Sequence, residues 1–186
     1  MIMQLETMEA WEVVSSLKGF EDYRFRKVPV ARYDENSYNV AFQLCLENKC
    51  GKYNTNWGCN PAAKRDVPDY LSKQDYVILV SRTFQVDPKD KELIEGISDD
   101  LHRTFRRIIQ ELRSNNVDCD GFLDGPCGYC GVCAYPEPCR YPDMCIPSIS
   151  TLGLNLKDWF ASFGEEFSFK EDEITLYGFV FVHTRA

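Results

Sequence analysis

The sequence predicts an α+β or α/β fold, in one domain whose mixed sheet is flanked by helices. Segments 75–86 and 173–183 are rich in β-branched and aromatic residues, which is typical of strands. Between them, residues 87–115 repeat apolar side chains every three or four positions, the spacing of an amphipathic helix. The chain has 186 residues, a length that suits a single domain. We therefore expect residues 1–186 to form one unit.

The N-terminal part predicts three elements. Residues 6–17 place apolar side chains at three-residue spacing, which indicates a short helix that Gly19 ends. Residues 23–33 alternate aromatic and basic side chains before Pro29, which favours an edge strand. Residues 38–46 fit a helix or a strand equally well.

The second half begins with the long helix. Asp87 and Pro88 predict its start, since an N-cap residue is followed by proline at the first helical position. Residues 118–123 predict a short strand. Residues 151–163 predict a helix capped by one of the serines just before it. The strand at 173–183 is apolar on both faces, so we expect it in the centre of the sheet.

Charge and hydropathy limit the partners. The net charge is −8, from 29 acidic and 21 basic residues, which argues against broad nucleic-acid binding. No stretch approaches the roughly 18 apolar residues of a membrane span, and the N-terminus lacks the pattern of a secretory signal. We expect a cytoplasmic protein that binds neither nucleic acid nor a membrane. The oligomeric state stays open.

The nine cysteines of the chain are its most informative residues about function. Eight lie in two loop-like segments, 45–61 and 125–147: Cys45, Cys50 and Cys59 in the first, and Cys127, Cys130, Cys133, Cys139 and Cys145 in the second. Cys119 has a strand-like context, which favours a buried, inert thiol. A reducing compartment disfavours disulfides, and an odd count fits a fully paired framework poorly. Metal binding is therefore the preferred interpretation of the two loops.

The spacing C-x2-C-x2-C at Cys127, Cys130 and Cys133 favours an iron–sulfur site, because ferredoxins begin their cysteine run in this way. In that run the next cysteine serves another cluster. We hypothesise one [4Fe–4S] cluster on these three thiols, with a remote fourth ligand from the upstream loop. A second centre would combine Cys139 with the upstream cysteines.

Alternatives remain. Zinc accepts four cysteines but usually takes two C-x2-C pairs, and a redox-active thiol pair is a third reading. The histidines, His102 and His183, lie outside both loops, so we expect core or surface roles for them. Basic residues in the long helix predict a solvated face: Arg103, Arg106, Arg107 and Arg113. Aromatic residues in the loops are interpreted as packing groups.

Three functions fit such a site. The first is an electron carrier or redox accessory with a redox protein as partner. The second is an enzyme whose cluster keeps one iron open to a small substrate. The third is a structural zinc module. Phosphate-binding glycine motifs are absent from the sequence, and no acid–base or nucleophile constellation accompanies the cysteines, which favours the first.

Three motifs resemble an uncharacterised family of bacterial and archaeal "predicted metal-binding proteins". They are W-x-C-x-P at 57–61, GPCxxCxxCAYPxPCRYP at 125–142 and PSxxxLGL at 147–154. The resemblance extends from Cys45 to Phe181 and implies a metal centre without a stated reaction. The chain departs from the family pattern at Asn60, where proline is usual. Cys145 lies outside the common pattern, which makes its ligand role less secure.

Overall fold

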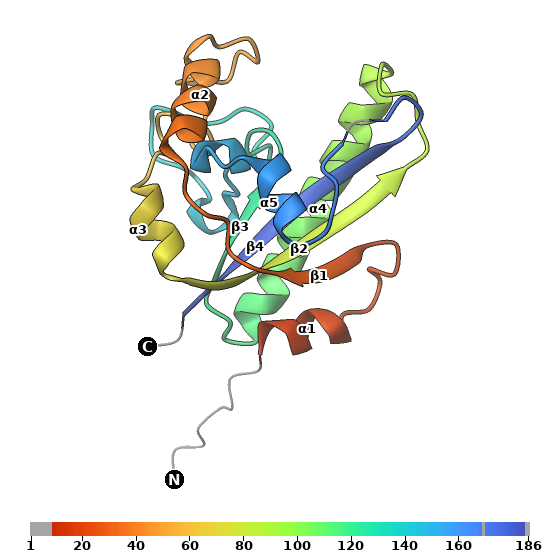
Figure 1. The fold of residues 1–186 in the computed structure, drawn as a ribbon. Helices are drawn as coiled ribbons and strands as arrows, with labels where there is room; N and C mark the ends of the chain where they lie inside the picture. The colour runs from red at the N-terminus through yellow and green to blue at the C-terminus, as the bar shows by residue number, and fades with distance from the viewer. Residues whose placement is uncertain (1–8, 169, 185–186) are drawn as a thin grey trace.

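The computed structural model describes residues 9–168 and 170–184, in which a four-stranded sheet is covered on both faces (Figure 1). The helices are α1 Ala10–Ser16, α2 Glu35–Leu46, α3 Val67–Ser72, α4 Lys91–Ser114 and α5 Leu156–Ser162, with 3-10 turns η1 Pro142–Met144 and η2 Ile149–Leu152. The strands are β1 Arg24–Val28, β2 Gln74–Phe84, β3 Cys119–Leu123 and β4 Ile174–His183.

The sheet confirms the α+β class and corrects the expectation of a mixed sheet. Its order is β1-β2-β4-β3, and every neighbouring pair is antiparallel. Strands β2 and β3 run the same way, as a strand–helix–strand unit predicts, but β4 lies between them. The expected edge position of β1 and central position of β4 are confirmed.

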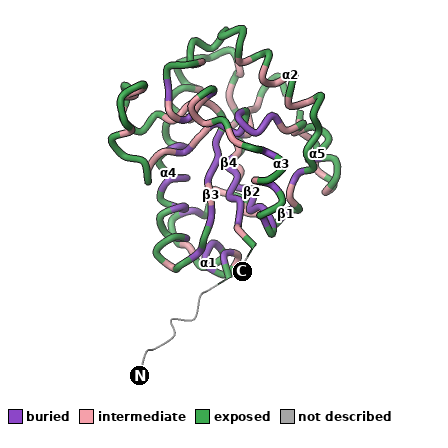
Figure 2. The backbone as a smooth tube through the Cα atoms, turned by 90° about the vertical axis from the view of Figure 1, so that its left-hand side faces the viewer, coloured by how far each residue is buried: buried purple, intermediate pink, exposed green. Residues whose placement is uncertain are grey.

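Two apolar cores lie on opposite faces of this sheet. Alternate residues of β2 divide between them: Tyr76 and Ile78 pack with α1 and α4, whereas Val77 and Leu79 pack with α3, η2 and α5. This division follows from the two-residue period of a strand. Figure 2 shows the central strands as the buried part of the chain, while α2 and the loops near it are mostly exposed.

Helix α4 packs closely on β3 and β4 because two glycines face it. A Cβ atom at Gly178 would lie 2.4 Å from the ring of Phe105. A Cβ atom at Gly121 would lie 2.9 Å from Ile109 and from the same ring. Close approach of this kind is a common reason for glycine in a strand. It holds α4 against the end of β3 from which the downstream cysteine loop starts.

Two predicted helix starts are wrong. Helix α4 is capped by Asp90, not Asp87, and begins at Lys91. The predicted helix 151–163 is divided, because Gly153 adopts φ 58 and ends η2, while Asn155 caps α5. Side-chain oxygens that accept from the first-turn N–H groups fix both starts.

The N-terminal half shows one further helix and resolves the ambiguous one. Residues 38–46 belong to α2, whose cap Asp34 accepts a hydrogen bond from the N–H of Ser37. Helix α3 was not predicted. The start of the predicted helix 6–17 lies partly outside the described residues, and α1 covers its remainder. No described helix combines the length and apolarity that crossing a bilayer requires.

Replacing Gly96 with alanine is expected to stabilise the fold. Gly96 lies within α4, and a methyl group there meets nothing within 4 Å. Alanine should raise the free energy of unfolding by about 0.5–1 kcal/mol, since glycine is the poorer helix former. Urea denaturation with an unchanged m-value measures this. Gly19→Ala is the control. Its methyl group would be equally free, but the φ of 82° at this position is strained for alanine, so this variant should not gain stability. An unchanged or lower free energy of unfolding in Gly96→Ala would contradict the prediction.

Candidate metal centre

The two cysteine loops lie at the same end of the sheet. The downstream loop, 124–147, leaves β3 and returns beside it, where the N–H of Leu123 donates to the carbonyl of Pro147 at 3.1 Å. The upstream loop, 47–66, joins α2 to α3. It contacts the returning chain where the N–H of Ser148 donates to the carbonyl of Gly58 at 2.8 Å. Backbone hydrogen bonds therefore connect β3 to both loops.

Asn56 and Gly58 hold the upstream loop against Cys127, the first cysteine of the downstream loop. The amide of Asn56 donates to the carbonyl of Cys127 at 3.0 Å and accepts from the N–H of Gly58 at 2.8 Å. A Cβ atom at Gly58 would lie 2.8 Å from both the Cβ and the backbone nitrogen of Cys127. Only glycine permits this approach without displacing one loop.

Aromatic side chains close the outer part of the same interface. The indole N–H of Trp57 donates to the carbonyl of Glu137 at 2.8 Å, and its ring meets Tyr135 edge-on at 5.1 Å. The hydroxyl of Tyr135 lies 2.7 Å from the side-chain oxygen of Asn54. These contacts agree with a packing role for the loop aromatics.

The upstream thiols form one group. Cys45, in the last turn of α2, lines a cavity of about 210 Å³ together with Cys50 and Cys59. Burial raises the pKa of Cys59 to about 11, and the nearby thiols of Cys50 and Cys45 add to the shift. A raised thiol pKa means that the charged form is poorly solvated, so a metal cation would be the natural counter-charge.

The downstream thiols form a second group around Cys127. The thiol of Cys145 donates to the sulfur of Cys127, which lowers the pKa of Cys127 and raises that of Cys145. The pKa of Cys145 is raised further by Cys139 and Cys133. The structure thus brings Cys145, the cysteine outside the family pattern, beside the start of the C-x2-C run. Cys130 is half-buried in the turn at 128–132.

Three N–H donors already point at sulfur atoms. The backbone N–H of Trp57 donates to the sulfur of Cys133 at 3.4 Å. The amide of Asn60 donates to the sulfur of Cys45 at 3.5 Å. The guanidinium of Arg106 donates to the sulfur of Cys127 at 3.8 Å. Hydrogen bonds to sulfur stabilise thiolates and tune the potential of iron–sulfur clusters.

The predicted solvated position of Arg106 is wrong. This residue is only 6% exposed, whereas Arg103 and Arg107 on the same helix are exposed as expected. Its guanidinium donates to the carbonyls of Met144 and His102 and lies over a tyrosine ring. The available signal was its place directly after Phe105 and two positions before Ile108, both of which belong to the apolar stripe of the helix.

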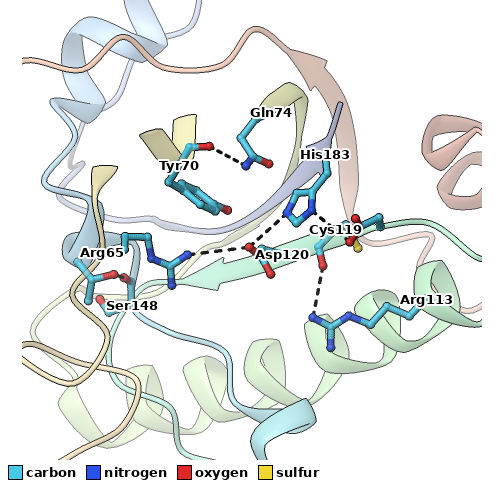
Figure 3. Close-up of polar contacts among 10 residues, drawn as sticks. Arg65, Tyr70, Gln74, Arg113, Cys119, Asp120, Ser148 and His183 are labelled. Atoms are coloured by element: carbon cyan, nitrogen blue, oxygen red, sulfur yellow. Dashed lines mark hydrogen bonds and ion pairs between the residues drawn. The ribbon is translucent and has the colours of Figure 1, made fainter. Parts of the chain in front are cut away.

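The histidines differ in their distance from the thiols. His102 is buried in α4 beneath the downstream loop, with Nε2 3.0 Å from the carbonyl of Asp124, and burial lowers its pKa. His183 lies near the opposite end of β3, between Asp118 at 3.1 Å and Asp120 at 3.3 Å (Figure 3). These positions fit the core and surface roles expected for them.

Cys119 is separate from both thiol groups. It is 3% exposed, and burial raises its pKa to about 12. Figure 3 shows it near the polar group of His183 and Asp120, where Arg113 donates to its carbonyl at 3.3 Å. The expectation of a buried thiol is confirmed, which makes Cys119 a natural control for the loop cysteines.

The thiols form two groups, but they do not lie close enough together to share a metal ion. In this conformation no three Cys, His, Asp or Glu side chains of residues 9–168 and 170–184 are close enough together to hold one metal ion. The donor set nevertheless fits a thiolate-ligated centre. Seven cysteines lie in the two adjoining loops and Cys45 lies in the last turn of α2 beside them, with N–H donors aimed at three of the eight. Ligation therefore requires the thiols to lie closer together than they do in this conformation.

Comparison with known proteins agrees with this chemistry. The family model described as "Predicted metal-binding protein (DUF2284)" matches residues 36–182, which include both loops. No curated protein and no solved structure matches the chain.

Proposed function

This chain belongs to that family of predicted metal-binding proteins, and on this premise we propose that its cysteine loops bind an iron–sulfur centre used in electron transfer or as a redox accessory. The observation that carries the proposal is the set of N–H groups directed at the sulfurs of Cys45, Cys127 and Cys133. Such donors surround the sulfur atoms of iron–sulfur clusters and help to set their potential.

The residues that would hold the centre come from both loops. Cys127, Cys130 and Cys133 supply the first three ligands of one [4Fe–4S] cluster, with Cys139 or Cys145 beside them. Cys45, Cys50 and Cys59 supply the remote ligand or a second centre. A bound cluster supplies one-electron transfer. The protein supplies burial, which half covers seven of these eight thiols, and the interlocked loops that keep them together.

An electron carrier also needs a surface on which a redox partner can dock near the centre. The downstream loop exposes apolar side chains beside its cysteines: Val132 is 81% exposed, Tyr141 51% and Tyr129 41%. Apolar and aromatic side chains of this kind are enriched where proteins associate. They support a redox protein as the partner of this loop.

Anaerobic reconstitution with iron and sulfide tests the proposal. We expect a brown protein that contains iron and sulfide in near-equal amounts and little zinc. Its visible absorption should bleach reversibly on one-electron reduction, without added substrate. Cys133→Ser is expected to lose most of this iron, since it removes a thiol of the C-x2-C run.

Cys119→Ser is the matched control, because it removes a buried thiol that lies outside both loops. It should retain the iron content of the unmodified protein. A colourless protein with stoichiometric zinc and no sulfide would replace the proposal with a structural zinc module. Equal iron loss in both variants would show that the effect is one of folding and not of ligation.

A further inference from the structure

A polar pocket lies at the end of the sheet where β2 and β3 begin and β4 ends, beside α3. Tyr70 of α3, Gln74 of β2, Asp120 of β3 and His183 of β4 line it, and its volume is about 480 Å³. Sites for small molecules are commonly about 300–1,000 Å³. Figure 3 shows these side chains around one space, with Arg65 at its edge. The pocket is therefore large enough for a ligand, and the cysteine loops start from the other end of β3.

The charged side chains of this pocket already have partners of their own. The ion pairs are His183 with Asp118 and Asp120, Arg65 with Asp120, and Lys73 with Asp69. Asp66 accepts the hydrogen bond that caps α3. A charged ligand would have to compete with these existing pairs, so the arrangement favours a neutral one.

Two uncharged polar atoms of the pocket have no such partner. Gln74 is only 8% exposed, and its Nε2 donates to the carbonyl of Tyr70 at 2.8 Å. Its Oε1 is buried without a hydrogen-bond partner in the described part of the chain, and so is the hydroxyl of Tyr70. Figure 3 shows both side chains directed toward the space beside His183 and Asp120. Buried polar atoms are nearly always paired, because an unpaired one loses its hydration without compensation.

We infer that this pocket binds a small neutral molecule that carries a primary carboxamide. An N–H group of the carboxamide donates to Oε1 of Gln74, and its carbonyl accepts from the hydroxyl of Tyr70. A carboxamide offers a donor and an acceptor on neighbouring atoms and carries no charge, which matches one unpaired acceptor and one unpaired hydroxyl among paired ions. The inference depends neither on the cysteine loops nor on a bound metal.

Four probes of similar size test the inference in nuclear magnetic resonance titrations of the whole nitrogen-15-labelled chain. Acetamide carries the carboxamide, acetone has a methyl group in place of the amino group, and acetate and ethylammonium are the charged comparisons. Acetamide should shift the side-chain amide signals of Gln74 in a saturable way. We expect it to bind about five-fold more tightly than acetone, the effect of one net hydrogen bond.

Two results of these titrations would overturn the inference. One is the absence of a saturable shift with acetamide, which is the result expected if water alone fills the pocket. The other is binding of acetone, acetate or ethylammonium at least as tight as that of acetamide, since the carboxamide would then not be what the pocket recognises.

Variants of the two wall residues separate the two hydrogen bonds, with the backbone amide signal of His183 as the readout. Gln74→Met removes the amide oxygen and should make the affinities for acetamide and acetone equal. Tyr70→Phe removes the hydroxyl that serves the carbonyl of both probes, so it should weaken both and keep the preference. Gln85→Met is the control, because Gln85 is exposed beyond the other end of β2 and bonds to Glu173. If Gln74→Met does not fold, Tyr70→Phe and the unmodified protein still decide the matter. A preference for acetamide that survives Gln74→Met would contradict the inference.

Discussion

Gly58→Ala is expected to abolish metal binding while the sheet and α4 stay folded. The added methyl would lie 2.8 Å from both the Cβ and the backbone nitrogen of Cys127, so the two loops must separate. Overpacking of this kind costs about 1–3 kcal/mol, and here it falls on the contact that holds the two thiol groups together. Iron and sulfide content after reconstitution measures binding, and far-ultraviolet circular dichroism measures the fold.

Gly128→Ala is the matched control for this substitution. Gly128 follows Cys127 directly, but a methyl there meets nothing within 4 Å and its φ is not in the left-handed region. It should therefore keep the metal content of the unmodified protein. If Gly58→Ala also kept that content, close contact between the loops would not be needed for binding. If both variants lost it, the cysteine loop would be intolerant of any added methyl.

Most regular elements could be predicted because their signals are local. The apolar runs of β2 and β4 and the stripe of α4 appear within single segments of sequence, and all three elements are present. The central position of β4 follows from its two apolar faces. Which strands it pairs with, and in which direction, is a long-range choice that no local pattern contains, so the sheet was expected to be mixed. The break at Gly153 was missed because a left-handed glycine and the Asn155 cap overrode a continuous apolar pattern.

The candidate site also combines features that the sequence predicts with features that it does not. Cysteine spacing indicated two loops, and the structure places those loops side by side. What the spacing could not indicate are the residues that join them. Asn56 and Gly58 looked like ordinary turn residues, yet they contact Cys127, which is about seventy positions away in the sequence. Their roles depend on tertiary contacts, which one sequence does not reveal.

The buried cation next to Cys127 is the least expected feature of the site. Within the described residues, Arg106 has no carboxylate among its hydrogen-bond partners; they are the carbonyls of Met144 and His102 and the sulfur of Cys127. A buried charge is costly unless it is well paired. A thiolate at Cys127 would give this guanidinium a charged partner, which agrees with the lowered pKa of that thiol.

Arg106→Met is expected to destabilise the metal-free protein by about 1–2 kcal/mol, because the carbonyls of Met144 and His102 each lose a hydrogen bond from the guanidinium. Arg103→Met is the control. Arg103 is exposed and forms a surface ion pair with Asp100 at 3.5 Å, so its loss should have little effect. Urea denaturation compares the two variants. Equal stabilities would contradict a structural role for the buried guanidinium.

The same substitution should also slow the reaction of Cys127 with iodoacetamide. The thiolate is the reactive form, and the pKa of an ordinary cysteine thiol is about 8.5. In the metal-free protein, the hydrogen bond from Cys145 and the Arg106 guanidinium contribute to a pKa of Cys127 below that value, so thiolate is present at pH 6. Without the guanidinium the pKa rises and the thiolate fraction at pH 6 falls. Peptide mass spectrometry would show slower alkylation of Cys127 in Arg106→Met and no change in Arg103→Met. An unchanged rate in both would mean that the hydrogen bonds from Cys145 and from the backbone N–H groups of Tyr129 and Ile146 hold the thiolate without Arg106.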